Sequence, residues 1–161
     1  LEITPYGTFA NTGLLTIGNA STATIAYLNT FTNTGSIEIN GGGELDLDTY
    51  ASALTQAQTA GGLVEIDGLF NAEGETLNIG TNSPFSTILN YGTLENATLV
   101  LNGGSLGIGF GLFKNDTVEG NFTVDGESTA EIQGTFAATG IDGTGPGTIT
   151  IDGADSTLLF N

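Results

Sequence analysis

Carboxylates are the only side chains in this chain whose number and spacing could support catalysis or metal binding. The 161 residues include 18 Asp and Glu, no His, no Cys and one basic residue, Lys114. Two groups of acids stand out: Glu44, Asp46 and Asp48, and the pair Asp125 and Glu127. Without an imidazole or a thiol there is no Ser-His-Asp or Cys-His arrangement, so any chemistry must use carboxylates, hydroxyls and amides.

Paired carboxylates can hydrolyse a glycosidic bond, one acting as the acid and the other as the nucleophile or base. Lyases of the pectate-lyase kind depend on basic residues instead, and Lys114 alone is a poor basis for that chemistry. In both groups, however, the acids alternate with other residues, as in ELDLD at residues 44–48. Such alternation is typical of the solvent face of an amphipathic strand. We therefore expect no enzyme, with a glycoside hydrolase as the alternative.

Calcium is the metal that these residues would suit, because it prefers carboxylate and carbonyl oxygens. Residues 41–47 (GGGELDL) partly resemble the calcium-binding nonapeptide of the repeats-in-toxin family, with Glu44 where that pattern has a glycine. The motif occurs once, whereas such sites need adjacent turns. Calcium is thus a candidate ligand of Glu44, Asp46, Asp48, Asp125 and Glu127, and we expect no cofactor to be required.

A repeat provides the elements that must position these acids. Residues 9–18 (FANTGLLTIG) and 31–41 (FTNTGSIEING) both have an aromatic anchor, a polar turn ending in glycine and a short alternating strand. Looser copies follow, and the anchors fall at positions 9, 31, 50, 70, 88, 113 and 136. A repeat of this length marks a solenoid, because one unit cannot bury its apolar side without stacking on the next.

The content of each repeat selects the kind of solenoid. Apolar and polar residues alternate in every copy, as in Val64-Glu65-Ile66, whereas helical spacing is nearly absent. The sequence therefore predicts an all-β parallel β-helix of about seven coils, each of roughly 18–25 residues, forming one domain over residues 1–161. Residues 51–62 break the alternation and contain helix formers, so they are either an irregular side of one coil or a short projecting helical turn.

Two further stretches bear on contacts. Residues 105–113 (SLGIGFGLF) alternate glycine with large apolar residues, which indicates either tight bends or a strand that another surface approaches closely. Asn11 and Asn33 occupy the same place in consecutive repeats, so we expect their side chains to form an amide ladder.

The recurring Asn-x-Gly rhythm resembles the passenger repeats of bacterial autotransporters and of filamentous-haemagglutinin-like adhesins. The copies that carry it are NTGLLTI at 11–17, NTGSIEI at 33–39 and NYGTL at 90–94. The resemblance covers most of the chain in rhythm and three coils in detail. It implies a right-handed parallel β-helix displayed outside the bacterial cell, and it implies no catalytic residue.

The net charge of −17 restricts the partners. Lys and Arg are needed to neutralise phosphates, so nucleic acids and anionic membrane surfaces are not expected ligands. The apolar runs are only a few residues long, so no membrane insertion is expected. An acid-rich, lysine-poor chain without cysteine is typical of secreted bacterial solenoids, with the acidic surface of a halophile's protein as the alternative. We expect an extracellular or cell-surface location.

Neither end of the chain is expected to be capped. Leu1 and Ile3 begin it, and Leu158, Leu159 and Phe160 lie at its end, so both ends expose apolar residues that invite pairing. The chain is then either a segment of a longer solenoid, whose partners are neighbouring coils, or a subunit that self-associates end to end into a fibre. The leading hypothesis is a non-enzymatic extracellular structural or adhesive β-solenoid, with a host-surface or glycan ligand. The second is a β-helix that binds or hydrolyses polysaccharide through a lateral acidic groove.

Overall fold

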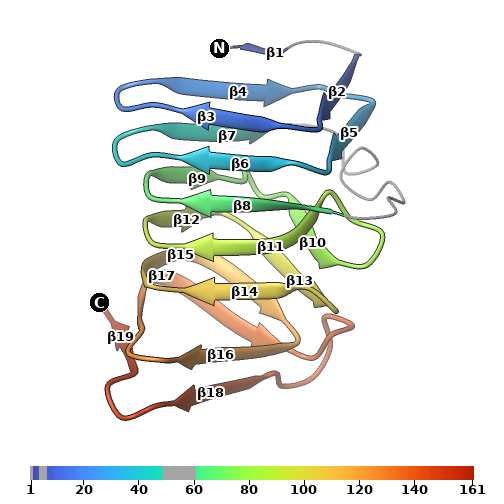
Figure 1. Ribbon diagram of the computed structural model, residues 1–161. Helices are drawn as coiled ribbons and strands as arrows, with labels where there is room; N and C mark the ends of the chain where they lie inside the picture. The colour runs from blue at the N-terminus through green and yellow to red at the C-terminus, as the bar shows by residue number, and fades with distance from the viewer. Residues whose placement is uncertain (1, 4–6, 49–60) are drawn as a thin grey trace.

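The chain winds as a three-sided coil of short parallel strands. The computed structural model describes residues 2–3, 7–48 and 61–161, with side chains described for 7–47 and 61–161. All strand pairs between named strands are parallel within this part, and every strand pairs with one from a neighbouring coil. Figure 1 shows the coils stacked from the N-terminus at one end to β18 at the other. The predicted β-solenoid fold is confirmed.

The first side of the coil is a continuous ladder of five strands. These are β3 (Leu14–Ile17), β6 (Ser36–Ile39), β8 (Gly62–Ile66), β11 (Phe85–Asn90) and β14 (Ser105–Ile108). Beyond β14 the ladder is interrupted. The next two strands on this side, β16 (Asn121–Asp125) and β18 (Thr148–Asp152), pair with each other in a separate sheet.

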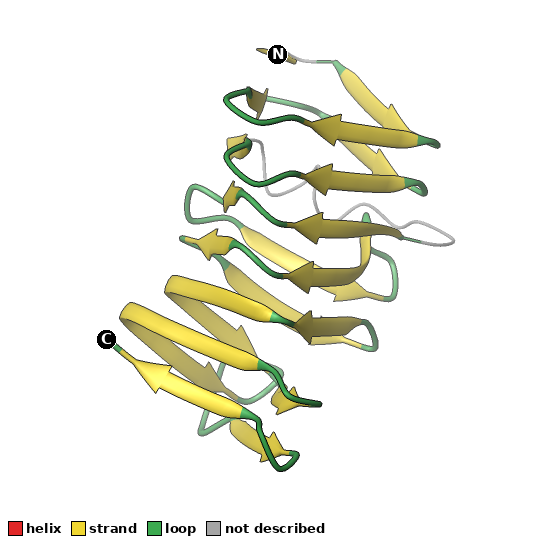
Figure 2. Cartoon of the chain, turned by 60° about the vertical axis from the view of Figure 1, so that its left-hand side comes forward, coloured by secondary structure: helices red, strands yellow, loops and turns green. Residues whose placement is uncertain are grey.

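The second side runs unbroken from one end of the stack to the other. Its strands are β1 (Glu2–Ile3), β4 (Thr22–Ala26), β7 (Glu44–Asp48), β9 (Leu69–Asn71), β12 (Thr93–Glu95), the first part of β15 (Phe110–Glu119), the first part of β17 (Thr129–Thr139) and β19 (Thr157–Phe160). The third side holds β2 (Thr8–Asn11) and β5 (Thr30–Asn33), and then β10 (Thr76–Gly80), β13 (Thr98–Asn102) and the second parts of β15 and β17. Figure 2 shows the same stack from another direction.

The regular part of the stack is shorter than the predicted number of coils. About five turns stack regularly on the first side, and two further turns carry β16 and β18 in a separate sheet, whereas the sequence predicts about seven coils. The anchors mislead because they do not share one position in the coil. Phe9 and Phe31 are in register on the third side, whereas Phe70 lies in a second-side row and Ile88 in a first-side row. Turn lengths vary, so apolar residues spaced by about 20 positions do not always reach the same side.

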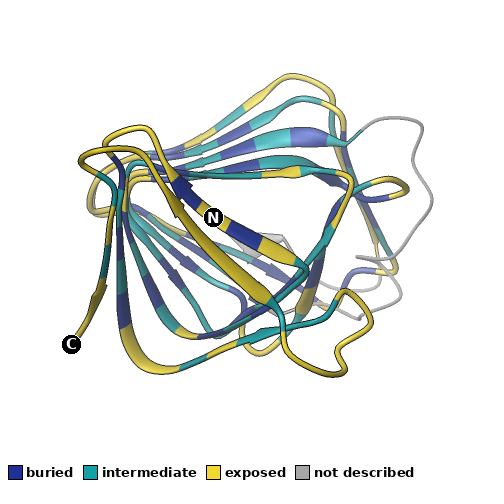
Figure 3. Cartoon of the chain, turned by 90° about the horizontal axis from the view of Figure 1, so that it is seen from below, coloured by how far each residue is buried: buried dark blue, intermediate teal, exposed yellow. Residues whose placement is uncertain are grey.

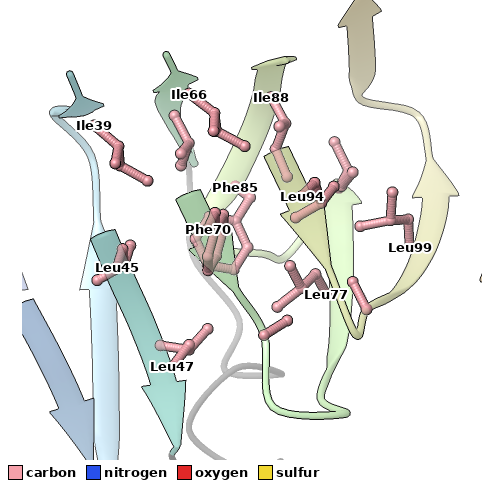
Figure 4. Packing of buried hydrophobic residues seen from close by; sticks show 14 of the residues in the cluster. Ile39, Leu45, Leu47, Ile66, Phe70, Leu77, Phe85, Ile88, Leu94 and Leu99 are labelled. Atoms are coloured by element: carbon pink, nitrogen blue, oxygen red, sulfur yellow. The ribbon is translucent and has the colours of Figure 1, made fainter. Parts of the chain in front are cut away.

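The core is a column of inward-facing rows. On the second side, one row passes through Leu45, Phe70, Leu94 and Phe113, each at most 1 % exposed. Figure 4 shows Leu45, Phe70 and Leu94 of this row among the other buried side chains of the core. Contacts between aromatic rings continue the core packing toward both ends of the stack. The Phe31 and Phe85 ring centroids are 5.6 Å apart, and those of Phe113 and Phe122 are 5.5 Å apart. Each such burial contributes about 1.5–3 kcal/mol.

Glycines hold the corners because the backbones of successive coils nearly touch there. A Cβ on Gly68 would lie 2.3 Å from the carbonyl oxygen of Gly43, and a Cβ on Gly92 would lie 2.3 Å from that of Gly68. Close approach, not a left-handed φ, therefore requires glycine at these positions. At another corner the amide of Asn11 donates from Nδ2 to Oδ1 of Asn33 at 2.8 Å, which confirms the predicted amide ladder.

The structure leaves two sequence predictions untested. The anchor Tyr50 and the helical-turn alternative at 51–62 fall on residues outside the described part, except that Gly61 and Gly62 are described and Gly62 begins β8. Within the described ranges, no helix is long and apolar enough to cross a membrane.

Candidate functional site

One of the acids predicted to carry chemistry, Asp46, belongs to an outward row on the second side. Asp46, Asn71, Glu95 and Lys114 are in register on β7, β9, β12 and β15. Each stands three positions after a corner glycine, so the same turn aims all four side chains outward. The row is polar and contains two acids, one amide and one lysine, and its members lie about one strand spacing apart, roughly 4.8 Å.

Crowding of like charges shapes the electrostatics of this row. Burial raises the pKa of Asp46, and the neighbouring Glu44, Glu73 and Glu95 raise it further, whereas a hydrogen bond from Asn71 lowers it. Lys114 relieves part of the repulsion, because its Nζ lies 2.8 Å from Oε2 of Glu95. The pair is partly exposed and is therefore a modest stabilising contact.

Asp116 is a buried acid that sequence reasoning missed. It sits at the irregularity of β15, where the register against β17 shifts, and its side chain is buried. The amides of Ala97 and Lys114 donate to its Oδ1 and Oδ2 at 2.7 and 2.9 Å. Burial raises the pKa of Asp116 to about 7 despite these two hydrogen bonds, and Glu95 adds to the rise. The carboxyl group ties the turn between β12 and β13 to β15 and is almost fully buried, so we assign it a structural role.

The structure separates the two groups of calcium candidates. Glu44 and Asp46 lie on the second side, where Glu44 accepts a hydrogen bond from the Thr22 hydroxyl at 3.1 Å. Asp125 ends β16 on the first side, and Glu127 follows in the turn. Asp48 ends β7, and its side chain lies outside the described part. Among the described residues, no group of three or more metal-binding side chains comes together.

A shallow groove follows the corner between the first and second sides. It has a volume of about 410 Å³ and is lined by glycines together with Glu44, Asp67 and Thr93. Two exposed aromatic residues lie at the same corner in the next coils. Tyr91 is 47 % exposed and Phe110 is 76 % exposed, and a Cβ on Gly109 would meet the Tyr91 ring. Acids and aromatic rings thus share one edge of the solenoid.

A second cleft opens where the first-side ladder is interrupted. It measures about 520 Å³ and lies between β14 and β16, lined by Leu101, Leu106 and Phe122 with Asn121 and Asp125 at its rim. Residues 105–107, the start of the glycine-alternating stretch, line this cleft. The gap is explained by geometry: β16 pairs with β18 and diverges from β14.

The C-terminal end of the stack exposes residues that belong to the core rows. Phe160 continues the inward row of Phe113 and Ile132 but is 65 % exposed. On the first side, Ile149 and Ile151 align with the buried Phe122 and Val124, and both are exposed. Figure 3 looks at this end from below and shows β18 exposed along its length, whereas β16 alternates between buried and exposed residues.

The residues predicted for self-association fall into different positions. Leu158 packs against the core, Phe160 shares the inward face with it, and Leu159 points outward, because it is in register with the outward Glu131. Ile3 pairs with Ile25 through β1, and its side chain is not described. Leu1 lies outside the described residues. Sequence reasoning missed Ile149 and Ile151, although their alternation in TITID already marked them as one face of a strand.

Three of the other residues that sequence reasoning missed could have been found from their spacing. Asn71, Glu95 and Lys114 could have been grouped with Asp46 by counting three positions from each corner glycine. No such rule finds Asp116, because its burial depends on a local irregularity of β15.

Protein-family models, curated proteins and solved structures were all compared with this chain, and none of them matches it. The fold therefore stands on the structure itself, which is that of a β-solenoid repeat protein.

Proposed function

We propose that the chain is a non-enzymatic structural β-solenoid module that works by stacking on further β-coils outside the cell. The observation that carries this proposal is the exposed face of the last coil, where Ile149, Ile151 and Phe160 continue rows that are buried elsewhere. An open edge of parallel strands with apolar side chains beside it is a template for further pairing.

The mechanism is mechanical. Each added coil extends the stack by about 4.8 Å and pairs the backbone groups of the coil before it. The sides that remain exposed are polar and acidic, with a net charge of −17, which keeps neighbouring stacks apart. Cations that screen this charge should favour stacking, since repulsion between exposed charges falls with ionic strength.

The surface location and the adhesin-like family are part of the same proposal. They are supported by the Asn-x-Gly rhythm and by an acid-rich, lysine-poor composition without cysteine. A chain with one Lys and no Arg also offers almost no cleavage site to trypsin-like proteases, which suits an exposed fibre.

Negative-stain electron microscopy and light scattering on the purified chain, with and without millimolar calcium, test the proposal. We expect elongated particles of uniform width and a mass that rises with protein concentration. Particles that stay compact and monomeric in both conditions would contradict it. A calcium-dependent rise that sodium at equal ionic strength does not reproduce would indicate a specific calcium contact.

The corner groove supports a second candidate function, polysaccharide binding. Tyr91 and Phe110 are exposed along the same corner as Glu44 and Asp67, in later coils, and exposed rings along a polar edge are suited to contact a sugar. Sedimentation of the chain with insoluble polysaccharides measures binding, and release of reducing ends measures hydrolysis. Phe110→Ala should abolish sedimentation if the rings bind the polymer, whereas Phe160→Ala, in an inward row two coils away, should leave it unchanged.

A further inference from the structure

We propose that the interruption of the first-side ladder is a binding site for an extended strand of another polypeptide, which enters between β14 and β16 and runs parallel to both. The strand carries apolar side chains at alternate positions and basic residues at its C-terminal end. This inference goes beyond the structural function proposed above and does not depend on it, because it concerns a lateral site between two coils.

The interruption results from where two successive coils place their linking residues. In one coil, residues 103–104 lie before β14 and only Gly109 follows it. In the next coil, only Gly120 lies before β16 and residues 126–128 follow it. β14 is therefore displaced toward the second side and β16 toward the third, although β13, β15 and β17 pair normally on the flanking sides. In Figure 1, β14 and β16 follow one another down the same side of the stack without belonging to one sheet.

The direction of backbone groups follows one rule throughout the stack. Residues on one face of a strand direct their N–H and C=O groups toward the same neighbouring strand. Outward residues bond to the coil before them: Leu63 N donates to Gly35 O at 3.1 Å, and Thr93 N donates to Gly68 O at 2.8 Å. Inward residues therefore direct their backbone groups toward the coil that follows.

This rule assigns the backbone groups that face the cleft. The inward residues of β14, Leu106 and Ile108, direct theirs toward β16, and the outward Thr123 of β16 directs its own toward β14. Among the described residues no ladder joins the two strands, and the Ser128 hydroxyl donates instead to Ile108 O at 2.5 Å. The cleft thus lies between two facing strand edges, and a parallel strand between them can pair with both.

The lining of the cleft suits a strand with alternating side chains. Leu101, Leu106 and Phe122 line it, and an adjoining cleft of about 260 Å³ shares Leu101 and continues past Ile141 and Pro146. An extended segment between β14 and β16 directs every second side chain inward to these apolar groups and the others to solvent. No ladder on the first side has to break for the segment to enter, because β16 and β18 already form a separate sheet.

Charge selects the partner. Asp125 lines the cleft where β16 ends, Asp152 is in register with it on β18, and Glu127 follows in the turn. A strand parallel to β16 ends beside these acids, so basic residues at its C-terminal end are complementary to them. A second copy of this chain is a poor partner, since its net charge is −17 and its single basic side chain, Lys114, is bonded to Glu95.

Amide hydrogen exchange, measured by NMR with a capped synthetic peptide of sequence TVTVTKK, tests the proposal. In the free chain, the amides of Leu106 and Thr123 should exchange at least about tenfold faster than those of Gly107 and Val124, which pair with β11 and β18. Saturating peptide should slow the first two amides to the rate of the second two.

Two control peptides separate charge from backbone pairing. TVTVTEE reverses the charge, and TVTVTKK methylated on the backbone nitrogens of both valines keeps the charge but loses the donors toward β16. Each should bind at least about tenfold more weakly than TVTVTKK. Equal binding of the three peptides, or no binding of TVTVTKK at millimolar concentration, would overturn the inference. Protection of Leu106 and Thr123 in the free chain would overturn it as well.

Proline variants test the open edge of β16 without a ligand. Thr123→Pro removes an N–H group that faces the cleft, whereas Thr150→Pro, in register with it on β18, removes one that bonds to β16. Thr123→Pro should keep the urea midpoint of the parent chain and bind TVTVTKK at least about tenfold more weakly, whereas Thr150→Pro should lower the midpoint. Equal losses of stability would show that Thr123 is already paired. That result would overturn the lateral site and leave the proposed stacking function standing.

Discussion

Similar residues occupy the same inward rows in the interior coils and in the last coil. The interior residues are covered by a coil on each side, whereas those of the last coil are covered on one side only. Phe70 lies between Leu45 and Leu94 in its row and is fully buried, whereas Phe160 has Ile132 on one side only and is 65 % exposed. Burial in a solenoid is therefore a property of neighbouring coils more than of the residue itself. The same substitution should have different costs at the two positions.

The largest difference is expected for the aromatic residues of that row. Phe70→Ala should lower the free energy of unfolding by about 3–5 kcal/mol, because it leaves a cavity among buried side chains. Phe160→Ala should lower it by less than about 1 kcal/mol in dilute solution, where the end coil is uncovered. Urea denaturation of both variants at micromolar concentration measures this. Equal losses would show that the last coil is covered within a single molecule, against the exposed fractions given above.

A smaller effect, dependent on pH, is expected at the interior acid Asp116. Its folded-state pKa of about 7 lies above the ordinary value of 3.8, so the folded state favours the protonated form. The stabilising contribution is complete below about pH 4 and is lost as the pH rises through 7. Over that window the loss is up to about 4 kcal/mol, at about 1.4 kcal/mol for each unit of pKa shift.

Asp116→Asn is the matched variant, since an amide has nearly the same shape and does not titrate. Urea denaturation from pH 4.5 to pH 8 should show the parent chain losing stability relative to this variant as the pH rises. A difference between the two that stays constant with pH would mean that the two amide donors hold the carboxylate charged.

Features that depend on neighbours in the sequence could be predicted, whereas features that depend on contacts between coils could not. Two-residue alternation and the Asn-x-Gly turns depend on neighbours in sequence, so they indicated the parallel β-solenoid and the Asn11–Asn33 ladder correctly. The coil count depends on turn lengths, which the anchors do not report. Alternation also explains Leu159: one position from the inward Phe160, it must face outward with Glu131.

The candidate site was predictable only in part. Acids on alternating strands were expected to face solvent, and Glu44 and Asp46 do so on β7. The grouping of Asp46 with Glu95 and Lys114 follows from counting three positions after each corner glycine, but the register between coils was needed to show which glycines stand at the corners. The burial of Asp116 could not be predicted, because it depends on the irregularity in β15 and no local sequence pattern indicates that irregularity.

The smallest expected effect concerns the corner glycines, and it has opposite signs in the two regions. At Gly68 an added Cβ would lie 2.3 Å from the carbonyl oxygen of Gly43, so Gly68→Ala must push two coils apart and should cost about 1–3 kcal/mol. At Gly13 no described atom is within 4 Å, and φ is not left-handed. Gly13→Ala should therefore leave the dilute chain unchanged or stabilise it by about 0.4–1 kcal/mol, because alanine restricts the unfolded chain. Thermal unfolding of both variants at micromolar concentration checks the signs. If Gly13→Ala is as destabilising as Gly68→Ala in a monomeric sample, then the corner at Gly13 is covered within a single molecule, against the open space around it.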